Sequence, residues 1–187
     1  MIQIVPYKAS WPEEFAVVSA EVRTVLGDTA LAVHHIGSTS VLGLAAKDVI
    51  DIQVTVADLN VPLKCLLENA GFIYRDDIIR NHAPPGMVLA SEELTKRYFQ
   101  RSERPVHLHV RASRRFNQRY ALLCRDFLRT QPLARDAYAE VKRQLSRYFP
   151  DNAEAYYDVK DPVFDVLMAG AFVWADLNGW QLPPSDA

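Results

Sequence analysis

The order of apolar and polar positions predicts alternating helices and strands in the first two thirds of the chain. Runs of β-branched and other apolar residues predict strands over 31–36, 48–56 and 72–74. Two further runs, over 98–100 and 106–110, flank a polar connection and predict an antiparallel hairpin. Helices are predicted from about 11 to 27, where Ser10 and Glu13 have the spacing of a capping box, and over 62–70, before Gly71.

From residue 113 onward, apolar and aromatic residues recur at helical spacing, so the part from about 113 to 178 is predicted to be helical. The last helix is expected over 153–177, with a kink or a restart at Asp161 and Pro162. The fold class predicted is α+β, with an α/β-like mixed sheet that helices flank, one face being covered. One domain is expected over 1–187.

Composition restricts the class of protein further. With 187 residues and 49% hydrophobic content, the chain can bury one sizeable core. The formal net charge of −2 provides no overall positive field, so nucleic acid is an unlikely partner. No apolar run approaches the roughly 20 residues that cross a bilayer, and the first residues do not resemble a signal peptide. We therefore expect no membrane partner and a cytoplasmic location. Cys65 and Cys124 lie in apolar helical patterns and are expected to be buried free thiols.

The segment from Gly37 to Ser40 combines a glycine with three hydroxyl residues, and a strand that carries Asp51 follows it. A glycine lets the backbone approach a ligand closely, and free N–H groups and hydroxyls in such a turn can bind an anion. Gly37, Ser38 and Ser40 are therefore candidate phosphate-binding residues. Lys47, at the start of the same strand, is a candidate phosphate clamp.

A cation site is predicted on the strand that follows the turn. Because side chains alternate along a strand, Asp51 and Gln53 share one face. Two-metal phosphoryl chemistry uses at least two carboxylates, and here there is one carboxylate and one amide. A weaker metal site, a mechanism with one metal ion and the absence of catalysis all remain open. Mg²⁺ or Mn²⁺ is expected first, with Zn²⁺ as the alternative.

His107 and His109 share one face of the second hairpin strand, which is suitable spacing for two ligands of one metal, or for one ligand and one general base. If that strand lies beside the Asp51 strand, the three side chains form one site with mixed Asp and His character. Arg97 on the first hairpin strand is a candidate for the phosphate-binding rim. The arginines at 119, 125 and 129 are interpreted as a solvated helix face.

The chain resembles the GrpB family nearly from end to end. The resemblance rests on the segments 5–7, 34–47, 50–52, 107–110 and 125–129, of which the run around Gly37 is the most specific. It implies a nucleotidyltransferase-like fold in which Gly37 and Ser38 match the phosphate turn and Asp51 matches the first metal carboxylate. Gln53 departs from the second carboxylate. Some relatives are fused to dephospho-CoA kinase, which implies a link to nucleotide or coenzyme A metabolism.

Three functions are therefore carried forward. The leading hypothesis is an enzyme that binds a nucleoside triphosphate with a divalent cation and transfers a nucleotidyl group to a small molecule or protein. The alternative is a non-catalytic module that binds a nucleotide or a phosphorylated metabolite, and Gln53 favours it. The third is a transition-metal site for hydrolysis, built from Asp51, His107 and His109.

Overall fold

The computed structural model describes residues 1–187 and contains five α-helices and five β-strands in the predicted order. The strands are β1 (Ala32–Ile36), β2 (Ile50–Val56), β3 (Ile73–Tyr74), β4 (Arg97–Arg101) and β5 (Val106–Ala112). The helices are α1 (Trp11–Leu26), α2 (Leu63–Asn69), α3 (Phe116–Thr130), α4 (Pro132–Tyr148) and α5 (Ala153–Asn178). A short 3-10 turn, Ser38–Ser40, follows β1.

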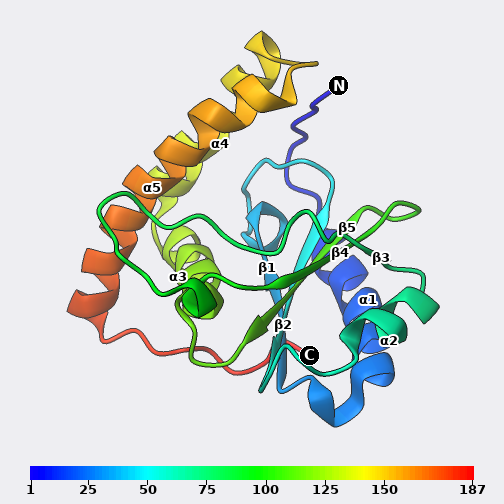
Figure 1. Cartoon of the computed structure of the whole chain (residues 1–187). Helices are drawn as coiled ribbons and strands as arrows, with labels where there is room; N and C mark the ends of the chain where they lie inside the picture. The colour runs from blue at the N-terminus through cyan, green and yellow to red at the C-terminus, as the bar shows by residue number, and fades with distance from the viewer.

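The strands form one mixed sheet in the order β1-β2-β5-β4-β3 (Figure 1). Strands β2 and β5 are parallel, and every other pair is antiparallel, including the predicted β4–β5 hairpin. The register places Asp51 opposite His107 and Gln53 opposite His109. The predicted adjacency of the Asp51 strand and the two histidines is therefore present.

Helices lie on both sides of the sheet, with α1 and α2 on one side and α3, α4 and α5 on the other (Figure 1). The expectation of a sheet covered on only one face is thus wrong. Apolar residues of β2 and β5, such as Ile52 and Leu108, pack with α1 and α2 in the larger core. A second core joins α3, α4 and α5 to the segment around Leu44. The sheet face that carries Asp51 is therefore the one that faces α3, α4 and α5.

Three local predictions need correction: the capping bond of Ser10, a restart of the last helix at Pro162 and the burial of Cys65. The Ser10 side chain makes no capping bond to the α1 backbone; its Oγ donates to Glu14 Oε1 at 2.6 Å. Helix α5 continues through Pro162, since its contacts with α3 and α4 outweigh the hydrogen bond that proline lacks. Cys65 is exposed, whereas Cys124 is buried as expected.

After α5 the chain turns at Gly179 and runs back across the molecule to the edge strand β1 (Figure 1). There the Asp186 amide donates to the Val33 carbonyl at 3.0 Å. The C-terminal tail therefore covers an edge of the sheet that would otherwise expose unpaired backbone groups. None of the five α-helices combines the length and the hydropathy needed to cross a membrane.

Candidate functional site

The glycine of the turn after β1 makes room for the side chain of Asp51. Gly37 has φ +68°, and a Cβ placed there would lie 2.3 Å from Asp51 Oδ2 and 2.8 Å from Asp51 Cγ. The sequence suggested that this glycine allows a ligand to approach the backbone. In the structure the group that approaches it is the carboxylate itself, and any larger residue would have to displace it.

Asp51 lies beside both histidines of β5. Its Oδ1 is 3.3 Å from His107 Nδ1 and 3.9 Å from His109 Nε2. Parallel pairing of β2 with β5 produces this arrangement, since the three residues lie on the same face of neighbouring strands. Such an arrangement suits two chemical roles. The three side chains could bind one cation, or Asp51 and a histidine could act as an acid–base pair.

The local environment shifts the pKa values of Asp51 and His109. Burial lowers the pKa of His109 to about 3, so its imidazole is neutral at pH 7. Burial also acts to raise the pKa of Asp51, but the imidazoles of His107 and His109 beside it outweigh that effect and hold the pKa below its usual range. A carboxylate beside a neutral imidazole is a donor set that suits Mn²⁺ or Zn²⁺ better than Mg²⁺. The structure contains no group of three or more His, Cys, Asp or Glu residues with the spacing of a formed metal site.

Gln53 does not share in this group. Its side chain is fully buried, its Nε2 donates to the Gln118 carbonyl at 3.0 Å, and its Oε1 accepts from Arg111 Nη1. The amide oxygen that was predicted to bind a cation is therefore already occupied by a cationic side chain. Gln53 is therefore not free to bind a cation.

The Asp51 group lies on the wall of a cavity of about 630 Å³ between the sheet and helices α4 and α5. Four lysines line it, and the Nζ of each lies over an aromatic ring. The distances from Nζ to ring centroid are 4.6 Å for Lys47 over Tyr157, 5.1 Å for Lys96 over Tyr98, 4.7 Å for Lys142 over Tyr138 and 5.3 Å for Lys160 over Tyr157. The rings hold the ammonium groups in place without neutralising them.

Only Lys160 among these lysines has a carboxylate within ion-pair distance, namely Asp161 at 2.6 Å. Lys142, on α4, is 3% exposed, and its Nζ donates to Ser38 Oγ at 2.8 Å and to the Ala45 carbonyl at 2.6 Å. Burial lowers the pKa of Lys142 to about 7 and that of Lys96 to about 8. Lys47, Lys96 and Lys142 thus line the cavity without a carboxylate within ion-pair distance.

The structure brings some predicted phosphate-binding residues to this cavity and not others. Ser38 and Lys47 line it. The Ser40 hydroxyl instead donates to the Gly37 carbonyl at 2.6 Å. Arg97 alternates with Tyr98 on β4, so it lies on the opposite face from His109, and Lys96 reaches the cavity in its place.

Sequence reasoning missed Lys142 and Lys160, and it favoured Arg97 over the neighbouring Lys96. A signal for Lys142 was present, because it lies four residues after Tyr138 and three before Leu145, on the buried stripe of α4. A lysine on an apolar stripe needs a polar partner or a ligand, and the turn at Ser38 supplies the partner.

Lys142 predicts a specific pH dependence of stability. Its pKa of about 7 in the folded protein lies below the ordinary value of about 10.4, so between pH 7 and 8.5 the unfolded chain binds more protons. The contribution of Lys142 to the free energy of unfolding should therefore rise with pH over this window. Urea denaturation of the wild type and of Lys142→Met should show a steeper rise for the wild type. Parallel curves would refute the shifted pKa.

The fold and the cavity together define a class: an α+β protein with a mixed five-stranded sheet, whose polar face carries an Asp–His group beside a lysine-lined cavity. The family model described as GrpB protein matches residues 1–169, and the chain belongs to the GrpB family.

Relatives of two lengths are similar to this chain. A UPF0157 protein of Halalkalibacterium halodurans is 31% identical over 91% of this chain and 82% of its own. A protein of Mycolicibacterium paratuberculosis named dephospho-CoA kinase is 33% identical over 96% of this chain but 48% of its own, so the chain spans about half the length of that relative. The crystal structure of the conserved protein GrpB from Enterococcus faecalis has a TM-score of 0.75 at 24% identity and covers 92% of this chain and 99% of that one. The predicted fold class is thereby confirmed.

Proposed function

We propose that this protein binds a nucleotide or another phosphorylated small molecule in the lysine-lined cavity. The observation that carries the proposal is the convergence of Lys47, Lys96 and Lys142 on one cavity without a carboxylate partner. A buried ammonium group is stabilised by a counter-charge, and a phosphoryl group supplies charge and several acceptor oxygens at once. Tyr138, Tyr157 and Phe164 line the same cavity and suit the base of a nucleotide.

A divalent cation is proposed to accompany this ligand. Asp51, His107 and His109 would hold it, because Asp51 Oδ1 lies 3.3 Å from His107 Nδ1 and 3.9 Å from His109 Nε2 and the carboxylate is ionised while His109 is neutral. The three side chains do not form a metal site as they stand, so they would have to adjust around the ion. When bound, the cation would neutralise phosphoryl oxygens and make phosphorus more electrophilic. Transfer of a nucleotidyl group is the second candidate function, and the observation that favours it is the Asp51–His107 contact at 3.3 Å, which offers a base within the cavity.

Thermal shift and calorimetry test the proposal with pyrophosphate, nucleoside mono-, di- and triphosphates and coenzyme A precursors, each with Mn²⁺, Zn²⁺, Mg²⁺ or EDTA. The last class is included because longer relatives carry the name dephospho-CoA kinase. A ligand at 100 times its dissociation constant should stabilise the fold by about 2.7 kcal/mol.

The Lys142→Met substitution should weaken binding at least about tenfold, since it removes a charge-assisted hydrogen bond while keeping the length of the side chain. Lys64→Met is the matched control, because Lys64 is exposed and lies over the Tyr74 ring, away from the cavity. It should bind as the wild type does. Absence of a shift with every phosphorylated compound, or equal losses in both variants, would contradict the proposal.

A further inference from the structure

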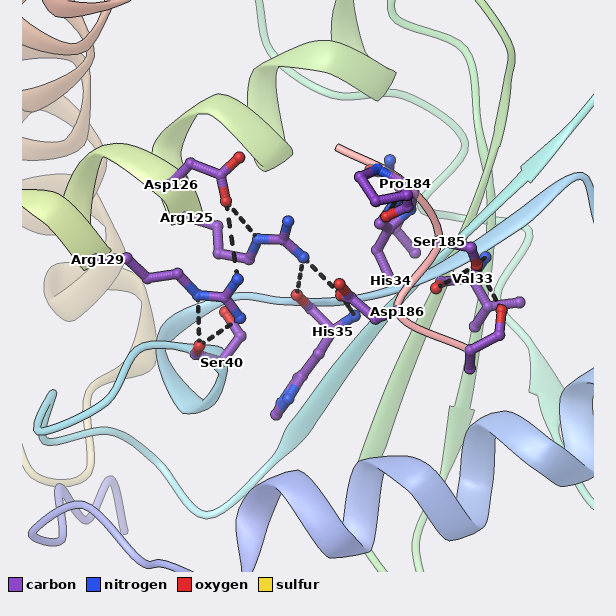
Figure 2. A network of polar contacts seen from close by, with 12 residues as sticks. Val33, His34, His35, Ser40, Arg125, Asp126, Arg129, Pro184, Ser185 and Asp186 are labelled. Atoms are coloured by element: carbon purple, nitrogen blue, oxygen red, sulfur yellow. Dashed lines mark hydrogen bonds and ion pairs between the residues drawn. The ribbon is translucent and has the colours of Figure 1, made fainter. Parts of the chain in front are cut away.

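The arginines of α3 that the sequence suggested to be solvated form a buried network with the C-terminal tail (Figure 2). The Arg125 side chain is 1% exposed. Its Nη1 donates to Asp186 Oδ2 at 2.6 Å and to the His35 carbonyl at 3.1 Å, and its Nε donates to Asp126 Oδ1 at 2.9 Å. A buried guanidinium group thus has two carboxylate partners, one from its own helix and one from the tail.

The tail is held against β1 by further hydrogen bonds (Figure 2). The Asp186 carboxylate accepts from the His35 amide at 2.9 Å. The Ser185 hydroxyl accepts from the Val33 amide at 2.8 Å and donates to the Val33 carbonyl at 3.0 Å. The tail lies beyond residue 169, where the match to the family model ends.

At its other end the network reaches the turn that carries the candidate site. Arg129 Nη1 lies 3.8 Å from Asp126 Oδ1, and its Nε and Nη2 donate to the Ser40 carbonyl at 3.0 and 2.9 Å. Ser40 ends the turn in which Gly37 contacts Asp51 and Ser38 accepts from Lys142. A continuous chain of ion pairs and hydrogen bonds therefore joins the tail to the turn (Figure 2).

Asp126 and Asp186 share the buried guanidinium group of Arg125, so a change at Asp186 affects Asp126 as well. If Asp186 lost its charge, Asp126 would be the remaining counter-charge of Arg125 and would be drawn toward it. The ion pair between Asp126 and Arg129, which is 3.8 Å long, would then weaken. The contact that would weaken is the one between Arg129 and the Ser40 carbonyl.

We infer that Asp186 is a positioning residue of the candidate site: through Arg125, Asp126 and Arg129 it holds the 37–40 turn in the geometry that binds a phosphorylated ligand. The inference rests on the proposed function for its ligand. It adds that the affinity of the cavity for a phosphorylated ligand depends on the contact between Asp186 in the tail and Arg125.

Calorimetric titration with inorganic pyrophosphate tests this in the full chain, at a temperature where circular dichroism shows every variant folded. Asp186→Asn should bind about tenfold more weakly than the wild type, as expected for residues that act through a network, and Asp186→Glu should recover part of the loss. Ser185→Ala is the control, since it removes the bonds to Val33 and leaves Arg125 untouched. It should stay within about twofold of the wild type.

Hydrogen exchange at the amides of Ser40 and Val41 provides a second readout that needs no ligand. Both amides bond within the turn, and they should exchange faster in Asp186→Asn than in Ser185→Ala. Equal pyrophosphate affinity in Asp186→Asn and the wild type, or unchanged exchange, overturns the inference and leaves the proposed function standing. Absence of binding to the wild type, with faster exchange in Asp186→Asn, instead overturns the proposed function and supports the structural link.

Discussion

The Gly37→Ala substitution is expected to lower the free energy of unfolding by about 3 kcal/mol and to separate Asp51 from His107. Two effects add. The backbone at Gly37 has φ +68° and ψ −173°, a conformation that residues with a Cβ rarely adopt. The added methyl group would also overlap Asp51 Oδ2, which lies 2.3 Å from its position. The carboxylate would have to rotate away, so binding of a cation or a phosphorylated ligand should fall with stability.

Urea denaturation and pyrophosphate titration measure the two consequences separately. Gly71→Ala is a matched control, because Gly71 has φ +81° and nothing lies within 4 Å of its added Cβ. That variant should show only the backbone strain, about 1 kcal/mol, and unchanged affinity. If both alanine variants lose the same stability and neither loses affinity, the contact between Gly37 and Asp51 is not what fixes the carboxylate.

The second large effect is expected for Arg125→Met, which should lower the free energy of unfolding by about 3 kcal/mol. Methionine keeps the apolar stem but leaves Asp126, Asp186 and the His35 carbonyl without their shared donor. These groups are only partly accessible to water, so hydration compensates in part. The tail should detach from β1 as a result.

Chemical denaturation measures the loss, and limited proteolysis of the tail reports its release. Arg119→Met on the same helix is the control, since Arg119 is exposed and its guanidinium group lies over the Trp180 ring, 5.5 Å from the ring centroid. That substitution should change the free energy of unfolding by no more than about 1 kcal/mol. If both substitutions lowered the free energy of unfolding equally, the buried ion pairs of Arg125 would not contribute the stability expected of them.

The part of the site that could be predicted depends on strand periodicity. Alternation places Asp51 on one face of β2 and both histidines on one face of β5, and the hairpin pattern identified β5 as a strand. The adjacency of β2 and β5 was a guess about topology that the sheet order bears out.

The rest of the site depends on packing between elements that are distant in sequence. The position of Lys142 on an apolar helix stripe indicates that it is buried, but not that the 37–45 segment covers it. The sequence around Arg125 likewise does not indicate that the C-terminal tail covers it. Gln53 was predicted to bind a cation because its contact with Arg111 is also not visible in the sequence. Its oxygen is occupied by Arg111, which lies two residues beyond His109 on the same strand face, and only the register of β2 with β5 brings them together.

The parallel pairing of β2 with β5 also determines at what stage of folding the site forms. The chain between these strands contains α2, β3 and β4, so Asp51 and His107 meet only after a long loop has closed. Closing such a loop is entropically unfavourable before its contacts form, which makes non-local pairing of this kind slow. Neither half of the chain carries the site alone. During synthesis, Asp51 therefore has no contact with His107 and His109 until β5 has been made and has paired with β2.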